Sequence, residues 1–122
     1  MHQVTITNQT SLQKKPINAR FCSSFLCRLR GLMFTKAISR GAGLLLVQER
    51  DSRLDSAIHM FFVNYDLAII WINNHKVVVD TCLARRWRPF YMPHKPARYT
   101  LEIHPEHLSD FRIGDLVNIT DG

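Results

Sequence analysis

Apolar residues follow the period of β-strands along most of this chain. Short alternating or β-branched runs are separated by Asn, Gly, Pro and charged residues, which is typical of strands joined by turns. Asn73 and Asn74, for example, precede a valine run, and Asn tolerates the positive φ angles of hairpin turns. We expect about seven strands, which cover residues 4–7, 44–47, 57–62, 67–72, 76–79, 98–103 and 116–119.

Two segments have helical patterns instead. Within residues 21–33, apolar side chains recur every three to four positions while Arg28 and Arg30 lie on the other side, which predicts an amphipathic helix. Gly31 weakens its last turn and helps to end it. Residues 105–111 are long enough for a short second helix near the C-terminus. The pattern predicts an α+β domain of mostly antiparallel strands, with a curled or barrel-like sheet.

Length and composition fit one globular domain that spans residues 1–122. The chain is 46% hydrophobic and 21% charged, and its five Gly, five Pro and 10% aromatic residues exclude disordered and collagen-like classes. No run approaches the ~18 apolar residues that a membrane-spanning helix needs. The first residues lack the basic and apolar regions of a signal peptide. We therefore expect a cytoplasmic protein with no membrane span.

The cysteines and histidines favour neither disulfides nor a metal. Cys22, Cys27 and Cys82 are an odd number without a signal peptide, which favours buried thiols in a reducing compartment. Their spacing is not that of a zinc site. His104 and His107 stand three residues apart beside a proline, and we expect them to be solvated rather than metal-bound. The sequence thus indicates no metal and no cofactor.

Positive charge is concentrated in two parts of the chain. Residues 1–48 hold seven Lys and Arg residues and no acid, whereas residues 49–122 hold nine against ten acids. A second basic segment interleaves cations with aromatic rings. Its candidate surface residues are Arg85, Arg86, Trp87, Arg88, Tyr91, Lys95 and Arg98. Such a segment suits phosphate neutralisation with base stacking, and it equally suits a strand and loop whose aromatics face inward beneath arginine stems.

Several motifs occur in the order of a known family. They are 30–34 (Arg-Gly-Leu-Met-Phe), 43–47 (Gly-Leu-Leu-Leu-Val), 58–62 (Ile-His-Met-Phe-Phe), 69–72 (Ile-Ile-Trp-Ile), 99–103 (Tyr-Thr-Leu-Glu-Ile) and 113–115 (Ile-Gly-Asp). Together they resemble the bacterial and archaeal domain of unknown function 192 over almost the whole chain. The first and third motifs are the most specific. The resemblance implies a compact, mainly β domain of about this length, and it supplies no reaction.

The chain departs from that family pattern just before residues 69–72. Where the family has a proline and then, two residues later, an aspartate, this sequence has Asp66 and Ala68. A shift of two residues keeps a strand side chain on the same face but moves it ~7 Å along the strand. The sequence leaves open whether Asp66 replaces the missing carboxylate.

Three residues are candidates for binding an anionic ligand. Arg30, at the helix end, either bonds the free carbonyls there or projects into a cleft and binds a carboxylate or phosphate. His59 lies in an apolar run, where a ring is half-buried beside a partner and acts as a core group or a general base. Glu102 shares a strand face with Thr100, which we expect to be the polar face. Its expected partner is Arg30, His59 or Arg98.

Three classes of function remain open. No catalytic motif emerges, and a nucleophilic pair of Cys82 and His59 has no local support, so a non-enzymatic role is favoured. We expect a binding or accessory domain that recognises an anionic ligand or acidic partner through its basic surface. One alternative is single-stranded nucleic-acid binding through segment 85–99. The other is a small hydrolase or transferase that uses Arg30 and His59, which requires that both line one cavity.

Overall fold

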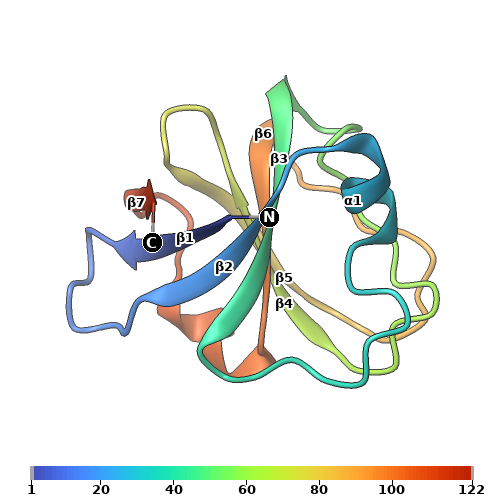
Figure 1. Ribbon diagram of the computed structural model, residues 1–122. Coiled ribbons are helices and arrows are strands. Elements are labelled where there is room, and N and C mark those ends of the chain that lie inside the picture. The colour runs from blue at the N-terminus through green and yellow to red at the C-terminus, as the bar shows by residue number, and fades with distance from the viewer. Residues whose placement is uncertain (1, 122) are drawn as a thin grey trace.

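The protein is built around one mixed seven-stranded sheet with two short helices. The structure is a computed structural model that describes residues 2–121 (Figure 1). The strands are β1 (Gln3–Asn8), β2 (Ile17–Cys22), β3 (Ala42–Ser52), β4 (Leu67–Ile72), β5 (Val78–Ala84), β6 (Ala97–Ile103) and β7 (Val117–Asp121). The helices are α1 (Phe25–Arg30) and the 3-10 helix η1 (Pro105–Asp110). The expected mostly-β fold, with one helix in the N-terminal half and a short one near the C-terminus, is confirmed.

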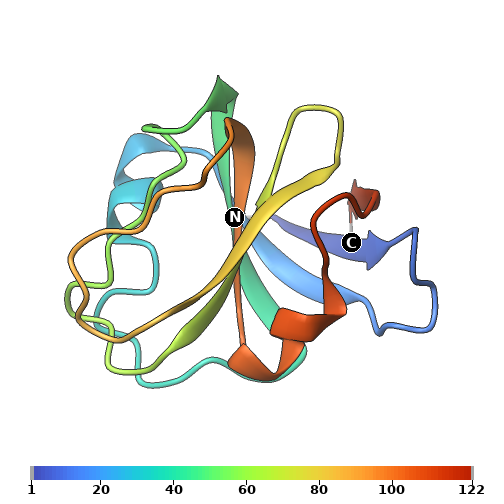
Figure 2. The ribbon, with the colours of Figure 1, turned by 180° about the vertical axis from the view of Figure 1, so that it is seen from behind.

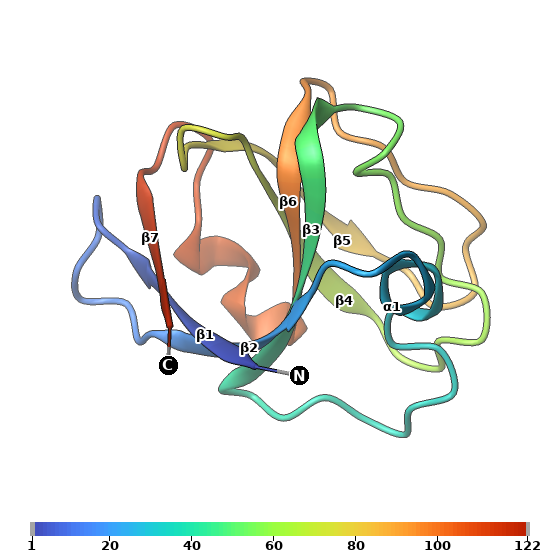
Figure 3. The same ribbon diagram turned by 45° about the horizontal axis from the view of Figure 1, so that its top comes forward.

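The strand order across the sheet is β5-β4-β6-β3-β2-β1-β7. Adjacent strands are antiparallel except β2 and β3, which are parallel. A parallel pair needs a crossover connection, and residues 23–41, which include α1, provide it. As a result α1 lies at one end of the molecule beside loops 53–66 and 85–96, while β1 and β7 lie at the other end (Figure 3).

The expected closure into a barrel is wrong, because the sheet stays open. The outer strands β5 and β7 are joined within residues 2–121 by one isolated bridge, between Val77 and Leu116, rather than by a ladder. Each outer strand pairs along its length with a different inner neighbour, β4 or β1, so the two diverge from the bridge (Figure 3).

Both faces of the sheet are covered by apolar side chains. In β3, Leu45 and Val47 belong to the core on the face that contains η1 (Figure 2), whereas Leu44 and Leu46 belong to the core beneath α1. A strand buried on both faces is apolar at consecutive positions. The expectation that residues 44–47 form a buried strand is therefore confirmed, with a physical reason for their lack of alternation.

Two of the expected elements are wrong. Residues 57–62 are not a strand: Ile58 makes one isolated bridge with Tyr91, and the segment crosses the sheet face with Met60 buried against it. The helix expected over residues 21–33 is shorter, because Phe21 belongs to β2. That strand was missed in the sequence.

Helix α1 buries none of its residues, contrary to the expected packing of its apolar stripe. The Ser24 side chain caps its first turn by accepting from the Cys27 N–H, and Gly31 ends it with a positive φ of 51°. Phe25, Leu26 and Leu29 stay exposed. Within α1 the partly buried Cys27 packs against the core, and contacts other than core packing also hold this helix in place.

A disulfide between Cys22 and Cys27 is one of those contacts, and it corrects the expectation of buried free thiols. Cys22 ends β2 and Cys27 lies in α1, with 5.7 Å between their Cα atoms. This bond removes the observation from which a reducing compartment was inferred. Cys82 remains a free thiol.

Replacing both Cys22 and Cys27 by serine is expected to lower the free energy of unfolding by about 2 kcal/mol, because the short closed loop restricts the unfolded chain. Urea denaturation of the two proteins measures the difference. Dithiothreitol should shift the midpoint of the natural chain towards that of the double variant and leave the variant unchanged. A midpoint that reductant does not move would contradict the expectation.

Candidate functional site

A small cavity of about 40 Å³ lies between the sheet and the C-terminal end of α1. Its walls come from the helix end, from β3 and β6, and from loop 53–66. The lining residues are Arg28, Leu29, Arg30, Gly31, Leu32, Leu46, Ala57, Ile58, His59, Val63 and Glu102. The fold thus brings together Arg30, His59 and Glu102, which are far apart in the sequence.

Glu102 lies at the base of this cavity and is almost completely buried. It is 4% exposed, and its neighbours across the ladder are Leu44 and Ile69. It shares a face with Thr100 as expected, but that face is the apolar one beneath α1, so the expectation of a polar face is wrong. No ion pair reaches Glu102 within residues 2–121, and its Oε1 atom has no hydrogen-bond partner.

Burial controls the ionisation of Glu102. The loss of water around the carboxyl disfavours its charged form and raises its pKa to about 8. The side chain is therefore mostly protonated at neutral pH. Glu102 also acts on Tyr65, whose pKa is raised by burial and by the nearby carboxylate, against the opposing effect of a hydrogen bond to Thr35.

Gly31 brings the helix end close to this carboxyl. A Cβ atom at position 31 would lie 3.7 Å from Glu102 Oε1, so the backbone of the helix cap covers the buried side chain. The Gly31 N–H donates to the Cys27 carbonyl at 2.9 Å, which fixes the cap. The end of α1 therefore forms a wall of the cavity.

The two arginines of α1 have different surroundings. Arg28 Nη1 donates to the carbonyl of Val47 at 3.1 Å and ties the helix to β3. Arg30 is exposed and lines the cavity, and its guanidinium has no hydrogen-bond or ion-pair partner in the described part of the chain. Of the two roles considered for Arg30, bonding the free helix carbonyls is not observed, and its guanidinium is available to a ligand.

His59 fastens the cavity wall. Its Nδ1 atom accepts from the Phe61 N–H at 3.2 Å, and its Nε2 atom lies 3.0 Å from the carbonyl of Leu29. This pair of contacts fits the tautomer with its hydrogen on Nε2, which donates to the carbonyl. Both ring nitrogens are used within the protein, so His59 lacks the open nitrogen that a general base needs.

Two open grooves flank the cavity. One, of about 530 Å³, shares Arg28 and His59 with the cavity and continues along β3 to Arg50. The other, of about 370 Å³, shares Arg30 and Gly31 with it. A ligand that lies in a groove can thus place one group against the cavity.

The basic and aromatic residues of segment 85–99 do not form one continuous surface. Arg85 and Arg86 lie beside Asp66, with nitrogen–oxygen distances of 3.9 and 3.3 Å. Arg98 instead contacts the turn at 73–77, where its guanidinium donates to Asn74 Oδ1 at 2.9 Å. Lys95 is exposed. The segment therefore divides into a loop near α1 and a strand that leads away from it.

Tyr91 and Arg88 hold the loop at 85–91 against its neighbour. Tyr91 is half-buried, and its hydroxyl accepts from the backbone N–H of Arg85 at 2.8 Å. The carbonyl of Arg88 accepts from the N–H of Met60 at 2.9 Å, while its side chain is exposed. Tyr91 has a structural role in the loop.

Asp66 lies outside the cavity, in the loop that precedes β4. It accepts a hydrogen bond from the backbone N–H of Arg86 at 3.0 Å, and that bond lowers the pKa of Asp66. It does not line the cavity, and Ala68 is buried in the core on the opposite sheet face from Glu102. The carboxyl group in the cavity comes from β6 instead.

Sequence reasoning named Trp87 as a surface residue but missed the cluster of exposed aromatic rings that it forms with Phe34 and Phe62, which we call the aromatic ladder. The rings of Phe34 and Phe62 stack with centroids 4.9 Å apart, and Trp87 meets Phe62 edge-on at 5.1 Å. All three residues have positive φ angles, of 63°, 60° and 66°. Such angles are unfavourable for bulky residues, and no sequence pattern predicts them.

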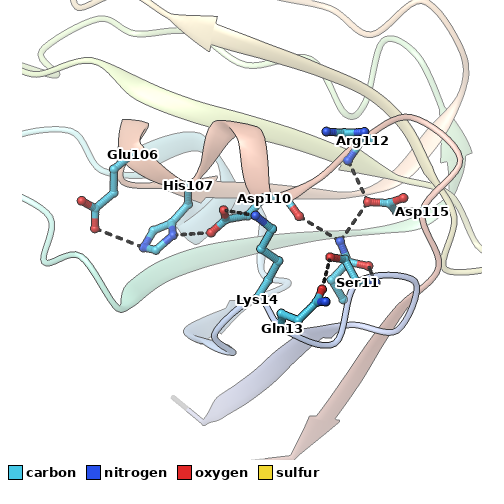
Figure 4. A network of polar contacts seen from close by, with 9 residues as sticks. Ser11, Gln13, Lys14, Glu106, His107, Asp110, Arg112 and Asp115 are labelled. Carbon is cyan, nitrogen blue, oxygen red and sulfur yellow. Dashed lines mark hydrogen bonds and ion pairs between the residues drawn. The ribbon is translucent and has the colours of Figure 1, made fainter.

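A second polar cluster lies at the opposite end, around η1 (Figure 4). His107 Nδ1 lies 2.8 Å from Asp110, and Lys14 lies 3.6 Å from the same carboxylate. The expectation that His107 is solvated is wrong, and His104 caps η1 by accepting from the Glu106 N–H. This cluster joins η1 to the loop that follows β1.

The remaining nucleophile candidate is not reactive. Burial, with a smaller effect of the Asp80 charge, raises the pKa of the Cys82 thiol to about 12. A thiol is a weaker nucleophile than a thiolate, so the pairing of Cys82 with His59 receives no support.

Within residues 2–121, no helix is long and apolar enough to cross a membrane.

The sequence of this chain is similar to a family model and to several archaeal proteins. The family model DUF192, described as Uncharacterized ACR, COG1430, matches residues 5–119. A UPF0127 protein of Thermococcus gammatolerans is 34% identical over 115 residues, which cover 93% of this chain and 73% of that protein. A UPF0127 protein of Pyrococcus furiosus is 34% identical over 95 residues, or 78% of each chain.

Solved structures share the fold. A protein of Sinorhizobium meliloti 1021 superposes with a TM-score of 0.84 at 14% identity, covering 97% of this chain and 92% of its own. A protein of unknown function from Novosphingobium aromaticivorans superposes with a TM-score of 0.82 at 18% identity, covering 95% and 83%. At these identities the likeness concerns the fold alone.

Proposed function

The chain belongs to the DUF192 (UPF0127) family, and because that family is described as uncharacterised, we propose from the cavity itself that the protein is a small binding domain for an anionic group. The observation that carries this proposal is the buried Glu102 carboxyl, whose Oε1 atom has no hydrogen-bond partner. A buried polar group without a partner is costly unless a ligand or water satisfies it.

The chemistry of the cavity favours an anion. A protonated Glu102 donates a hydrogen bond, and Arg30 offers a guanidinium that no protein group engages. A carboxylate accepts from both donors at once, and charge-assisted hydrogen bonds of this kind are the strong ones. The cavity holds about three water molecules by volume, so it suits a carboxylate head group rather than a whole cofactor.

Catalysis is less well supported than binding. Arg30 and His59 line one cavity, which is the arrangement that the hydrolase or transferase hypothesis requires. However, both ring nitrogens of His59 are engaged by the protein, and among the described residues no serine, threonine or cysteine lines the cavity. A binding role needs only the two groups that the protein leaves without a partner, the Oε1 atom of Glu102 and the Arg30 guanidinium.

The proposal is tested by titrating the protein with sodium acetate and following the backbone amide signals of Gly31 and His59 by NMR. Acetate should shift these signals at pH 6.5, and Arg30→Gln should weaken its binding about tenfold, since a hydrogen bond to a charged group contributes roughly 1.5–3 kcal/mol. Arg112→Gln, which removes the same charge at the opposite end, should leave the affinity unchanged.

The pH dependence gives a second readout. Glu102 repels an anion once it ionises, so acetate affinity should fall as the pH rises through about 8. The Glu102→Gln variant should lose this dependence. Shifts that are absent at pH 6.5, or equal for Arg30→Gln and the natural chain, would overturn the proposal.

A further inference from the structure

The aromatic ladder is an unusual surface feature, because its three large apolar rings are exposed to water. Phe34 is 66%, Phe62 43% and Trp87 48% exposed, although the rings touch one another. Each residue sits on a different loop, and each has a positive φ angle. An exposed apolar patch built from strained positions is a sign of an interaction surface.

Hydrogen bonds between the three loops hold the aromatic ladder in place. The Phe34 N–H donates to the carbonyl of Phe62 at 3.0 Å, and the Trp87 N–H donates to the carbonyl of Met60 at 3.0 Å. The indole N–H of Trp87 donates to Asn64 Oδ1 at 2.9 Å. These donors are satisfied within the protein, so they do not need water when the rings leave it.

Internal satisfaction of donors is the requirement for entering an apolar phase. A side-chain donor without a partner costs free energy there, and the one donor that the three rings carry, the Trp87 indole N–H, is bonded to Asn64. A protein or nucleic-acid partner imposes no such requirement, because its own polar groups can pair with open donors. The hydrogen bonds therefore favour a lipid surface over a polar macromolecule.

The charge around the aromatic ladder indicates the charge of the lipid surface that it would contact. Lys36 lies two residues after Phe34, and Arg88 directly follows Trp87. Both side chains are exposed and have no ion-pair partner in the described part of the chain. Arg85 and Arg86 share Asp66, so they keep part of their positive charge. A second copy would bring like charges together, whereas an anionic surface would not.

We propose that the aromatic ladder is a docking surface for the headgroup region of an anionic lipid bilayer. Phe34, Phe62 and Trp87 enter the interface, where aromatic rings are favoured, and Lys36 and Arg88 lie against the anionic headgroups. Helix α1, on which Phe25, Leu26 and Leu29 are exposed, lies beside the loops that carry Phe62 and Trp87 (Figure 3). None of the three rings lines the anion cavity.

The two tryptophans make the test direct. Trp71 is 1% exposed, and its indole donates to the carbonyl of Ser56, so it does not respond to the surface. Trp87 is the exposed reporter. Vesicles of phosphatidylcholine with one quarter phosphatidylglycerol should shift the tryptophan emission to shorter wavelength and sediment the protein, and pure phosphatidylcholine vesicles should do so far less. Added salt should weaken the binding.

Two sets of variants separate the contributions. Two double variants should each lower vesicle binding at least tenfold: Phe34→Ser with Phe62→Ser, and Lys36→Glu with Arg88→Glu. The second pair keeps the apolar rings and changes only exposed charges, so it guards against loss of folding in the first. Leu12→Ser with Ile113→Ser, which removes exposed apolar residues at the opposite end, should bind like the natural chain.

Several results would overturn the proposal. One is the absence of an emission shift and of sedimentation with anionic vesicles at low salt. Another is unchanged binding in the Phe34→Ser, Phe62→Ser variant, which would place the contact elsewhere. A third is a response to a single-stranded oligothymidylate without one to vesicles, which would assign the surface to nucleic acid. Equal binding to neutral and anionic vesicles would overturn the role given to charge.

Discussion

Glu102→Gln is expected to raise the free energy of unfolding by about 3 kcal/mol at pH 7. The pKa of this carboxyl is about 8 in the folded protein and 4.5 without burial. Between these pH values the folded state binds more protons than the unfolded state, so the stability of the natural chain falls as the pH rises. At 1.36 kcal/mol per pH unit, most of the loss is complete by pH 7.

The direction of this effect can be checked by urea denaturation at several pH values. The natural chain should have its full Glu102 contribution below pH 4.5, lose stability up to about pH 8, and change little from this group above it. Glu102→Gln should remove that slope. The matched control is Glu49→Gln, an exposed carboxylate on β3, which should change stability little. A natural chain whose stability rises between pH 5 and 8 would contradict the expected burial.

Gly43→Ala is expected to destabilise the fold by about 3 kcal/mol. Gly43 lies in β3 where β2 and β6 flank it, and a Cβ there would come within 2.8 Å of the Ile103 side chain and 3.0 Å of the Glu102 carbonyl. The second contact is with backbone, which cannot move without disturbing the ladder. Overpacking of a closed core typically costs about 1–3 kcal/mol.

Gly41→Ala is the control, because a Cβ at Gly41 meets nothing within 4 Å. The control should match the natural chain or exceed it slightly, since alanine has the lower entropy in the unfolded state. Thermal denaturation followed by circular dichroism compares the three proteins. If the two variants had the same melting temperature, the close packing described between β2, β3 and β6 would be contradicted.

The strands were predictable where the apolar pattern and local turns agree. The run at 67–72 and the alternation at 98–103 both correspond to strands within a residue or two, since their β-branched and aromatic side chains suit a buried sheet. Strand β2 was missed because its last residues, Phe21 and Cys22, also fit the helical period that follows.

The segment at 57–62 shows where such reasoning fails. Its apolar residues are buried as a strand's would be, yet they cover the sheet instead of joining it. The Ser56 carbonyl accepts from Trp71 Nε1 and from the Thr100 hydroxyl, which anchors the segment on the sheet face. A one-dimensional pattern records burial but not which neighbour causes it.

The sequence predicted three residues that line the candidate cavity, Arg30, His59 and Glu102, but it did not predict that Glu102 is buried. Period two placed Glu102 on the face of Thr100, but only the three-dimensional path of α1 shows that this face is covered. The aromatic ladder had no signal, because positive φ angles at Phe34 and Phe62 arise from contacts between loops.

The pairing of β1 with β7 has a consequence for synthesis of the chain. Val4 lies opposite Asp121, so this pairing joins residues that are far apart in the sequence. While the ribosome is still making residues 117–121, β1 has no partner on its outer side and exposes unpaired backbone groups there. The outer side of β1 therefore stays open to wrong strand pairing until residues 117–121 have emerged, and the pairing that covers it is a long-range one.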